Sequence, residues 1–176
     1  MKQRTQTRIH ISVARQRLSV KRGRTMVRSF PISTSKYGLG AKEGSFKTPT
    51  GRFRIAEKFG GGLPTEIAFK SRVPLEPTPE MLGGEDLVMS RILWLDGLEA
   101  GNANSYGRFI YIHGTNHEED IGRPASHGCI RMKNADVAEL FRLVPVETPV
   151  VIAPPRAPRR VAKKGEKSVA RGKRPA

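Results

Sequence analysis

The residues best suited to chemistry lie between positions 113 and 131. The chain has a single cysteine, Cys129, and Ser126, His127 and Gly128 directly precede it. A second histidine, His113, stands earlier in the sequence. A thiol becomes a good nucleophile at neutral pH when a neighbouring imidazole or a helix N-terminus favours the thiolate. These residue types and their spacing predict a cysteine nucleophile that transfers an acyl group.

Two histidines could act as the base for this thiol. His127 is two residues from Cys129, so its direction relative to the sulfur depends on whether the chain is extended or turned. His113 ends the run Arg108–Ile112, which is β-branched and aromatic and therefore predicts a strand. A strand end is the more rigid platform for a base that must lie at hydrogen-bond distance. We therefore assign His113 as the general base.

Gly128 and Arg131 complete the predicted site. Glycine before the nucleophile permits a tight turn with positive φ, which leaves the amides of Gly128 and Cys129 free to point at a developing oxyanion. Arg131 could hold a substrate carboxylate by a bidentate contact.

Other readings of the same residues remain open. A lone cysteine can be a small buried apolar residue, and the dyad would serve a protease or amidase of ordinary L-peptide specificity equally well. Zinc would have four candidate ligands in His113, His117, His127 and Cys129. They lack the paired short spacings of a structural zinc site, so no metal site is expected.

The surrounding pattern predicts a mainly-β domain, a sandwich or barrel, with one short helix after Cys129. The helix should begin with Asn134 as its N-cap, because Val137, Leu140, Phe141 and Val144 form one apolar face. Residues 9–20 and 27–33 should form a hairpin, and residues 35–51 a loop. Further strands are predicted at residues 52–56, 87–95, 108–113 and 148–152. Glycine and proline break the stretch 57–104 into short pieces, so its secondary structure is the least clearly predicted.

Charge divides the chain into a domain and a tail. The formal net charge is +16, yet nine Lys/Arg lie in residues 1–28, nine in 156–176, and residues 29–155 have a net charge of −1. We predict a domain over residues 1–153 and a basic, disordered tail over 154–176. The tail could provide solubility or contact an anionic polymer or membrane surface. No aromatics alternate with its charges, so no specific nucleic-acid binding is expected. Neither a transmembrane run nor a signal peptide is expected in this sequence.

The site motif resembles a known signature. His113-Gly114-Thr115, followed by the run from Ser126 to Met132, is similar to the signature of the L,D-transpeptidase catalytic domain family (YkuD-like). The likeness extends over residues 8–153 and includes the turn 48–51. It implies a mainly-β domain whose cysteine attacks peptidoglycan stem peptides between the third residue, a diamino acid, and the fourth, D-alanine. An amine then resolves the acyl-enzyme to form a crosslink, or water resolves it as in a carboxypeptidase.

The resemblance also implies roles by position. Cys129 would be the nucleophile, His113 the proton acceptor and donor, and the Gly128–Cys129 backbone the oxyanion site. The matching positions Ser126, His127 and Arg131 would shape the substrate pocket. No cofactor is implied, and the expected location is the cell envelope or periplasm. The rival hypothesis is a noncatalytic module that binds cell wall or nucleic acid through its basic termini.

Overall fold

The computed structural model describes residues 6–155, and their ten strands form one sheet. Its longest path runs β3-β2-β1-β10-β4-β7-β5-β6, and β8 and β9 continue from β7. The strands are β1 (Thr7–Ser12), β2 (Arg17–Arg22), β3 (Thr25–Pro31), β4 (Gly51–Phe59), β5 (Ala68–Lys70), β6 (Val73–Leu75), β7 (Val88–Gly97), β8 (Tyr111–Gly114), β9 (Ile130–Met132) and β10 (Pro149–Ala153). The predicted mainly-β architecture is confirmed.

The predicted N-terminal hairpin is in fact three strands. A short 3-10 helix, η1 (Val13–Arg15), divides the alternating run that we expected to be continuous. Gln16 follows it with φ of 45° and turns the chain into β2, which pairs antiparallel with both β1 and β3. Apolar alternation persists on both sides of this turn, so hydrophobic pattern alone did not reveal it.

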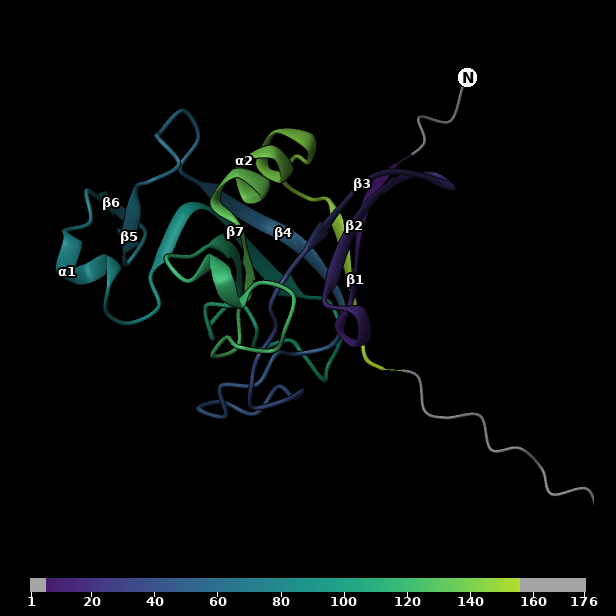
Figure 1. The fold of residues 1–176 in the computed structure, drawn as a ribbon. Coiled ribbons are helices and arrows are strands. Elements are labelled where there is room, and N and C mark those ends of the chain that lie inside the picture. Colours follow the sequence, from purple (N-terminus) through teal and green to yellow (C-terminus); the bar gives the residue numbers. More distant parts are fainter. Residues whose placement is uncertain (1–5, 156–176) are drawn as a thin grey trace, which may run out of the picture.

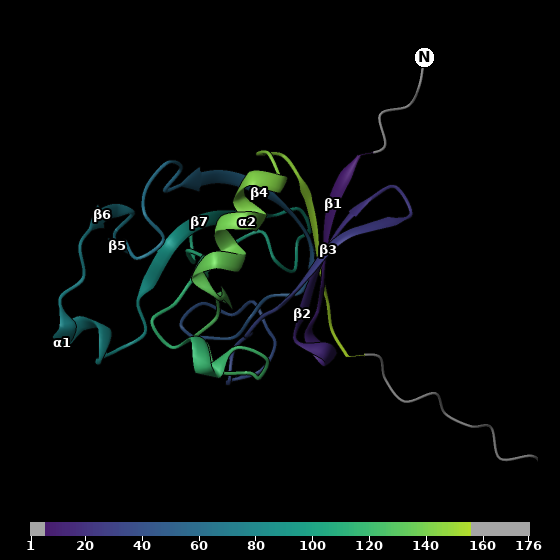
Figure 2. The ribbon, with the colours of Figure 1, turned by 45° about the horizontal axis from the view of Figure 1, so that its top comes forward.

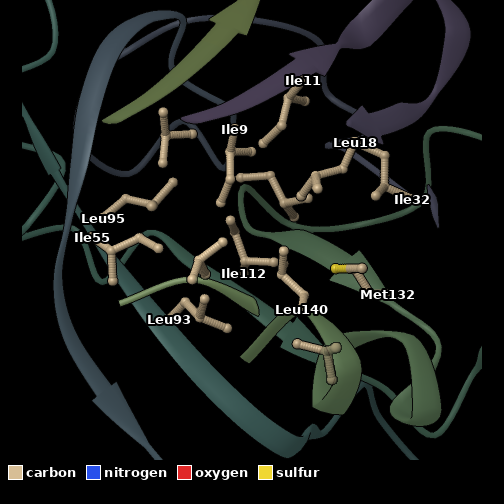
Figure 3. Close-up of a cluster of buried hydrophobic side chains, with 14 of the residues drawn as sticks. Ile9, Ile11, Leu18, Ile32, Ile55, Leu93, Leu95, Ile112, Met132 and Leu140 are labelled. Carbon is tan, nitrogen blue, oxygen red and sulfur yellow. The ribbon is translucent and has the colours of Figure 1, made fainter. Parts of the chain in front are cut away.

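The sheet curls so that strands far apart in its order share one core. Ile9 and Ile11 of β1 pack in the same buried cluster as Leu93 of β7, Ile112 of β8 and Leu140 of the main helix (Figure 3). Side chains alternate across a strand, so β1, β2, β4 and β10 each send every second residue into this interior. Each such buried aliphatic side chain contributes about 1.5–3 kcal/mol.

The helix after Cys129 is confirmed as α2 (Asn134–Leu143), with Val137 and Leu140 buried. Its N-cap is Lys133 rather than Asn134, so the helix starts one residue earlier than predicted. Figures 1 and 2 show α2 lying across β7. A second helix, α1 (Pro79–Leu82), is a single turn capped by Thr78.

The stretch 57–104 supplies the central strand and one end of the molecule. β7 pairs with β4, β5 and β8. Figures 1 and 2 show β5, β6 and α1 together at one end, with β1–β3 at the other. No helix within residues 6–155 is long and apolar enough to cross a membrane. The predicted tail, apart from Pro154 and Pro155, lies outside the described residues.

Candidate active site

Cys129 lies directly before β9, beside the segment that leads into β8. The N–H of Tyr111 donates to its Sγ at 3.4 Å, and its thiol donates to the carbonyl oxygen of Phe109 at 3.3 Å. Burial raises the pKa of the Cys129 thiol to about 11. We expected the helix N-terminus to favour the thiolate, but β9 lies between Cys129 and α2. The resting thiol is therefore protonated at neutral pH.

His113 comes from the neighbouring strand. β8 and β9 are parallel with Ile112 opposite Ile130 and His113 opposite Arg131. Because side chains alternate, His113 and Cys129 project from the same face. His113 is 3% exposed, and its Nδ1 lies 2.5 Å from the carbonyl oxygen of Gly114. That oxygen can only accept, so Nδ1 carries the proton and Nε2 keeps a free lone pair.

Burial lowers the pKa of His113, and the nearby negative charge of Asp86 partly offsets this effect. The imidazole is thus neutral at neutral pH. Thiol and imidazole form an uncharged pair in the resting protein, with one proton on sulfur and an acceptor lone pair on nitrogen.

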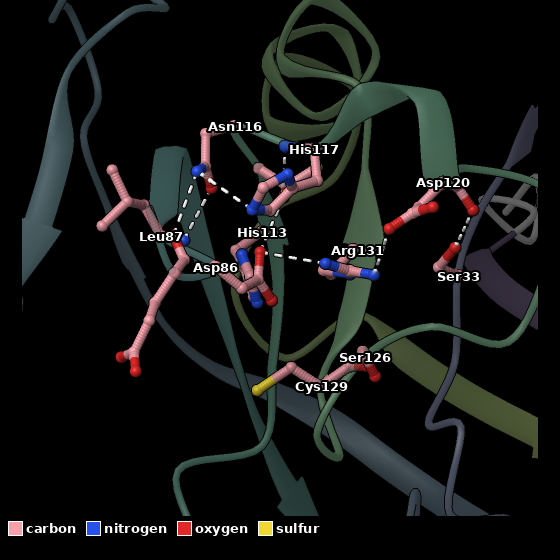
Figure 4. Close-up of polar contacts among 12 residues, drawn as sticks. Ser33, Asp86, Leu87, His113, Asn116, His117, Asp120, Ser126, Cys129 and Arg131 are labelled. Carbon is pink, nitrogen blue, oxygen red and sulfur yellow. Dashed lines mark hydrogen bonds and ion pairs between the residues drawn. The ribbon is translucent and has the colours of Figure 1, made fainter. Parts of the chain in front are cut away.

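Both side chains face a pocket of about 520 Å³. Its lining residues are Glu85, Asp86, Val88, His113, Ser126, His127 and Cys129. In Figure 4 the Cys129 side chain and the His113 ring reach this space from adjacent strands. The structure therefore brings together four of the six residues that the sequence singled out.

Arg131 is placed differently from our expectation. Its side chain is 2% exposed, its Nη1 lies 3.0 Å from Asp86 Oδ1, and its Nη2 lies 3.8 Å from Asp120 Oδ2 (Figure 4). A guanidinium buried in this way is not accessible for a bidentate contact with a substrate carboxylate. Arg131 instead holds Asp86 against the pocket.

The loop before Cys129 is fixed by its own hydrogen bonds. Ser126 is buried, and its Oγ donates to the Cys129 carbonyl at 2.6 Å and accepts from the Gly128 N–H at 3.3 Å. Gly128 has φ of +123°, as the sequence predicted, and its carbonyl accepts from Thr48 Oγ1 at 2.9 Å. The Gly128 N–H is thus not free, because it already donates a long hydrogen bond to Ser126. His127, in contrast, is exposed at the pocket, 5.7 Å from the Tyr37 ring.

The comparisons with known proteins agree with this geometry. The family model of the L,D-transpeptidase catalytic domain (YkuD) matches residues 6–152. The chain belongs to the L,D-transpeptidase catalytic domain family. YqjB of Bacillus subtilis is 54% identical over 46 residues, which make up 26% of either chain. The probable L,D-transpeptidase YbiS of Escherichia coli K12 is 52% identical over 44 residues, 25% of this chain and 14% of that protein.

Solved L,D-transpeptidases share the fold. The enzyme from Xylanimonas cellulosilytica aligns with a TM-score of 0.57 at 19% identity, over 87% of this chain and 63% of that one. A mutant of the Enterococcus faecium L,D-transpeptidase aligns with a TM-score of 0.55 at 18% identity, over 84% and 50%. The chain thus spans about a quarter or less of these curated relatives and under two thirds of these solved chains.

Asp86 and Tyr111 of this L,D-transpeptidase-family site escaped the sequence analysis, which named Thr115 only as part of the motif. Asp86 lies in the stretch 57–104, whose secondary structure is the least clearly predicted from sequence. Thr115 Oγ1 donates to Asp86 Oδ1 at 2.7 Å. Tyr111 contacts the sulfur through its backbone, a role that no side-chain pattern reveals. Asp86 could have been suspected only as an acid close in sequence to a predicted strand.

The zinc hypothesis finds no support within residues 6–155. That part of the chain contains no group of three or more potential protein ligands arranged to hold a metal ion. His117 does not line the pocket, and its Nε2 lies 3.0 Å from the carbonyl of Gly84.

Proposed function

We propose that this protein is a cysteine-dependent L,D-transpeptidase that acts on the tetrapeptide stems of peptidoglycan. One observation carries the proposal: Cys129, directly before β9, and His113, on the parallel neighbour β8, line the same pocket. The family membership supplies the substrate class. The chemistry of the pair supports acyl transfer in general.

The first half-reaction starts from an uncharged pair. As Cys129 Sγ attacks the carbonyl carbon of the third stem residue, its proton passes to Nε2 of His113. The C–N bond to D-alanine then breaks, and the imidazolium returns the proton to the leaving amine. The negative charge of Asp86 stabilises the imidazolium while it exists, and the Gly114 carbonyl fixes the ring orientation. A thioester and free D-alanine result.

The second half-reaction reverses these roles. His113 takes a proton from an acceptor amine or from water as that group attacks the thioester, and the proton returns to the departing sulfur. An amine gives a crosslink, and water gives a tripeptide. The proposed activity therefore includes D-alanine release as a carboxypeptidase.

The backbone amides of Gly128 and Cys129 are the proposed oxyanion donors. For Gly128, the substrate oxygen would replace Ser126 Oγ, whose 3.3 Å contact is long for a hydrogen bond and cheap to exchange. Among the proposed substrate-binding residues, His127 would contact the substrate directly. Ser126 would act indirectly by holding the loop before Cys129, and Arg131 would act indirectly by holding Asp86 at the pocket.

The proposal needs neither a metal nor an organic cofactor. A peptidoglycan substrate places the protein in the cell envelope or periplasm. The basic residues 156–176 are proposed to contact anionic polymers or membrane surfaces there, with no specific nucleic acid as partner.

Incubation with a disaccharide-tetrapeptide and mass spectrometry tests the function. We expect loss of D-alanine, dimers, or both, and we expect neither from Cys129→Ala. Thr25→Ala, an exposed change at the start of β3 and away from the pocket, is the control and should match the parent protein. An unchanged substrate, or equal turnover by Cys129→Ala, would refute the proposal. Cleavage of an all-L peptide at a similar rate would favour an ordinary protease.

β-Lactams offer a second test of the thiol. A solved L,D-transpeptidase of Mycobacterium tuberculosis, 16% identical to this chain with a TM-score of 0.52, is described as a complex with a faropenem-derived adduct. We expect faropenem to add its mass once to the parent protein and not to Cys129→Ala. A noncatalytic binding module would remain unmodified.

A further inference from the structure

The turn between β5 and β6 carries an arginine that packs on the aromatic cluster against which the proposed nucleophile also packs. Ser71 and Arg72 form this turn with φ of 51° and 69°. Asn and Gly are the usual residues at such positions, because other side chains are strained there. The backbone thus holds Arg72 in an uncommon conformation that directs it back over the sheet.

Aromatic side chains fix the Arg72 guanidinium in place. It lies 4.8 Å from the centre of the Trp94 ring and 5.6 Å from that of Phe109, and its Nη1 donates to the Tyr111 hydroxyl at 3.4 Å. Trp94 is itself stacked on Tyr106 at 4.1 Å. Among residues 6–155, no carboxylate forms an ion pair with Arg72. A positioned guanidinium therefore retains donors for an anion.

Arg72 lines a small cavity of about 170 Å³, and two other residues that line it contact the sulfur of Cys129. The lining residues are Phe69, Ser71, Arg72, Val88, Ile92, Phe109 and Tyr111. The backbones of Phe109 and Tyr111 both contact Cys129 Sγ. Val88 also lines the 520 Å³ pocket. The two spaces thus share one wall residue, and two residues that line the smaller space contact the sulfur in the larger one.

The two spaces differ in charge. The larger pocket is lined by Glu85 and Asp86, whereas Arg72 is the charged residue that lines the smaller one. A free carboxylate is therefore favoured on the Arg72 side. The small volume, well below that of a cavity for a drug-sized ligand, fits one small amino acid and not a branched stem.

We propose that Arg72 is a specificity residue that binds the free carboxylate of the residue that leaves during acylation. The inference rests on the proposed function. As the thioester to Cys129 forms and the C–N bond breaks, the leaving amine takes its proton from His113, and its carboxylate stays paired with Arg72. A donor that ends in a neutral amide lacks this contact.

The test compares two donors, the tetrapeptide with a C-terminal carboxylate and the same peptide as its C-terminal amide. With the full chain, we expect kcat/KM to be at least about 10-fold higher for the acid, as for a hydrogen-bonded charge pair. Arg72→Ala and Arg72→Gln should lower the value for the acid to that for the amide and leave the amide unchanged. Arg72→Lys should restore part of the preference, and Arg15→Ala, an exposed arginine elsewhere, should keep all of it.

The outcomes separate this inference from the function on which it rests. Equal use of both donors by the parent protein, or an acid preference that survives Arg72→Ala, would overturn the role of Arg72 and leave the transpeptidase proposal standing. A parallel loss on both donors would assign Arg72 a structural role and would also overturn it. If the parent protein releases D-alanine from neither donor, both proposals fall. The rate of Cys129 alkylation by iodoacetamide, a small neutral reagent, should be the same in Arg72→Ala as in the parent.

Discussion

At the scale of single residues, the site depends on a protonated thiol and a neutral imidazole rather than on a preformed ion pair. Burial raises the pKa of Cys129 and lowers the pKa of His113, so both shifts favour the uncharged forms. In the proposed mechanism the thiol becomes nucleophilic as its proton passes to His113 during attack on the substrate carbonyl. A thiol that is otherwise protonated would react slowly with other electrophiles.

Alkylation by iodoacetamide should reveal the raised pKa of Cys129. Because the reagent consumes thiolate, and a pKa of about 11 leaves only about one thiol in ten thousand ionised at pH 7, the rate should climb with pH and reach its half-maximum near pH 11. The same cysteine in the urea-unfolded chain is a matched control, with an expected midpoint near pH 8.5. A folded-state midpoint at or below that of the unfolded chain would contradict the uncharged pair.

Asp86→Asn should destabilise the fold and weaken the base together. The change leaves the buried guanidinium of Arg131 without its 3.0 Å partner, a loss that typically costs about 3–5 kcal/mol. It also removes the negative charge that raises the pKa of His113, so that pKa should fall further. Urea unfolding measures the first effect. Glu85→Gln, the exposed neighbour, should change stability by less than about 0.5 kcal/mol.

A double substitution checks the cause of that loss. Asp86→Asn combined with Arg131→Met removes both charges, so it should be more stable than Asp86→Asn alone. If the double variant were instead the less stable of the two, the ion pair would not explain the effect of Asp86.

At the scale of elements, the pattern of apolar residues predicted the individual strands and the helix, which depend mainly on local sequence. The strands around Leu93 and Ile112 follow from runs of apolar, β-branched and aromatic residues, and the apolar face of α2 follows from helical periodicity. The placement of Asp86 at the pocket of Cys129 and of Arg72 on Trp94 does not, because it depends on which strands pair across the sheet. The motif around Cys129 predicts the nucleophile, but only the parallel pairing of β8 and β9 places His113 on its face.

A contact between β4 and the C-terminal end of α2 should contribute to the stability of the fold. Lys58 Nζ donates to the carbonyl oxygens of Phe141 and Val144 at 2.7 and 2.8 Å, so a strand residue caps the C-terminal end of the helix. A cation there also interacts favourably with the helix dipole. Lys58→Met should lower the free energy of unfolding by about 1–2 kcal/mol, measured in urea. Lys70→Met, an exposed lysine, is the control, and an equal effect of both changes would argue against the cap.

At the scale of the whole molecule, the basic segments 1–28 and 156–176 and the proposed catalytic residues belong to different regions of the chain. β1 and β10 are parallel neighbours, so the described chain starts and ends on one part of the sheet (Figure 1). His113 lies on β8, and Cys129 directly precedes β9. Residues 29–155 have a net charge of −1 against +16 for the full chain. The excess positive charge is thus outside the part that builds the pocket.

Deleting residues 156–176 should therefore separate attachment from catalysis. Turnover of a soluble tetrapeptide should stay within about 2-fold of the parent, because the deleted residues are joined to β10 rather than to the strands of the site. Binding to isolated anionic cell-wall polymer should weaken, and its dependence on salt concentration should flatten, since nine Lys/Arg are lost with a single Glu. A full-length variant with these nine residues changed to Gln should behave like the deletion. A second variant, in which each of these Lys is replaced by Arg and each Arg by Lys, keeps the charge and should behave like the parent. Unchanged polymer binding after the deletion would show that the interaction belongs to the remaining residues.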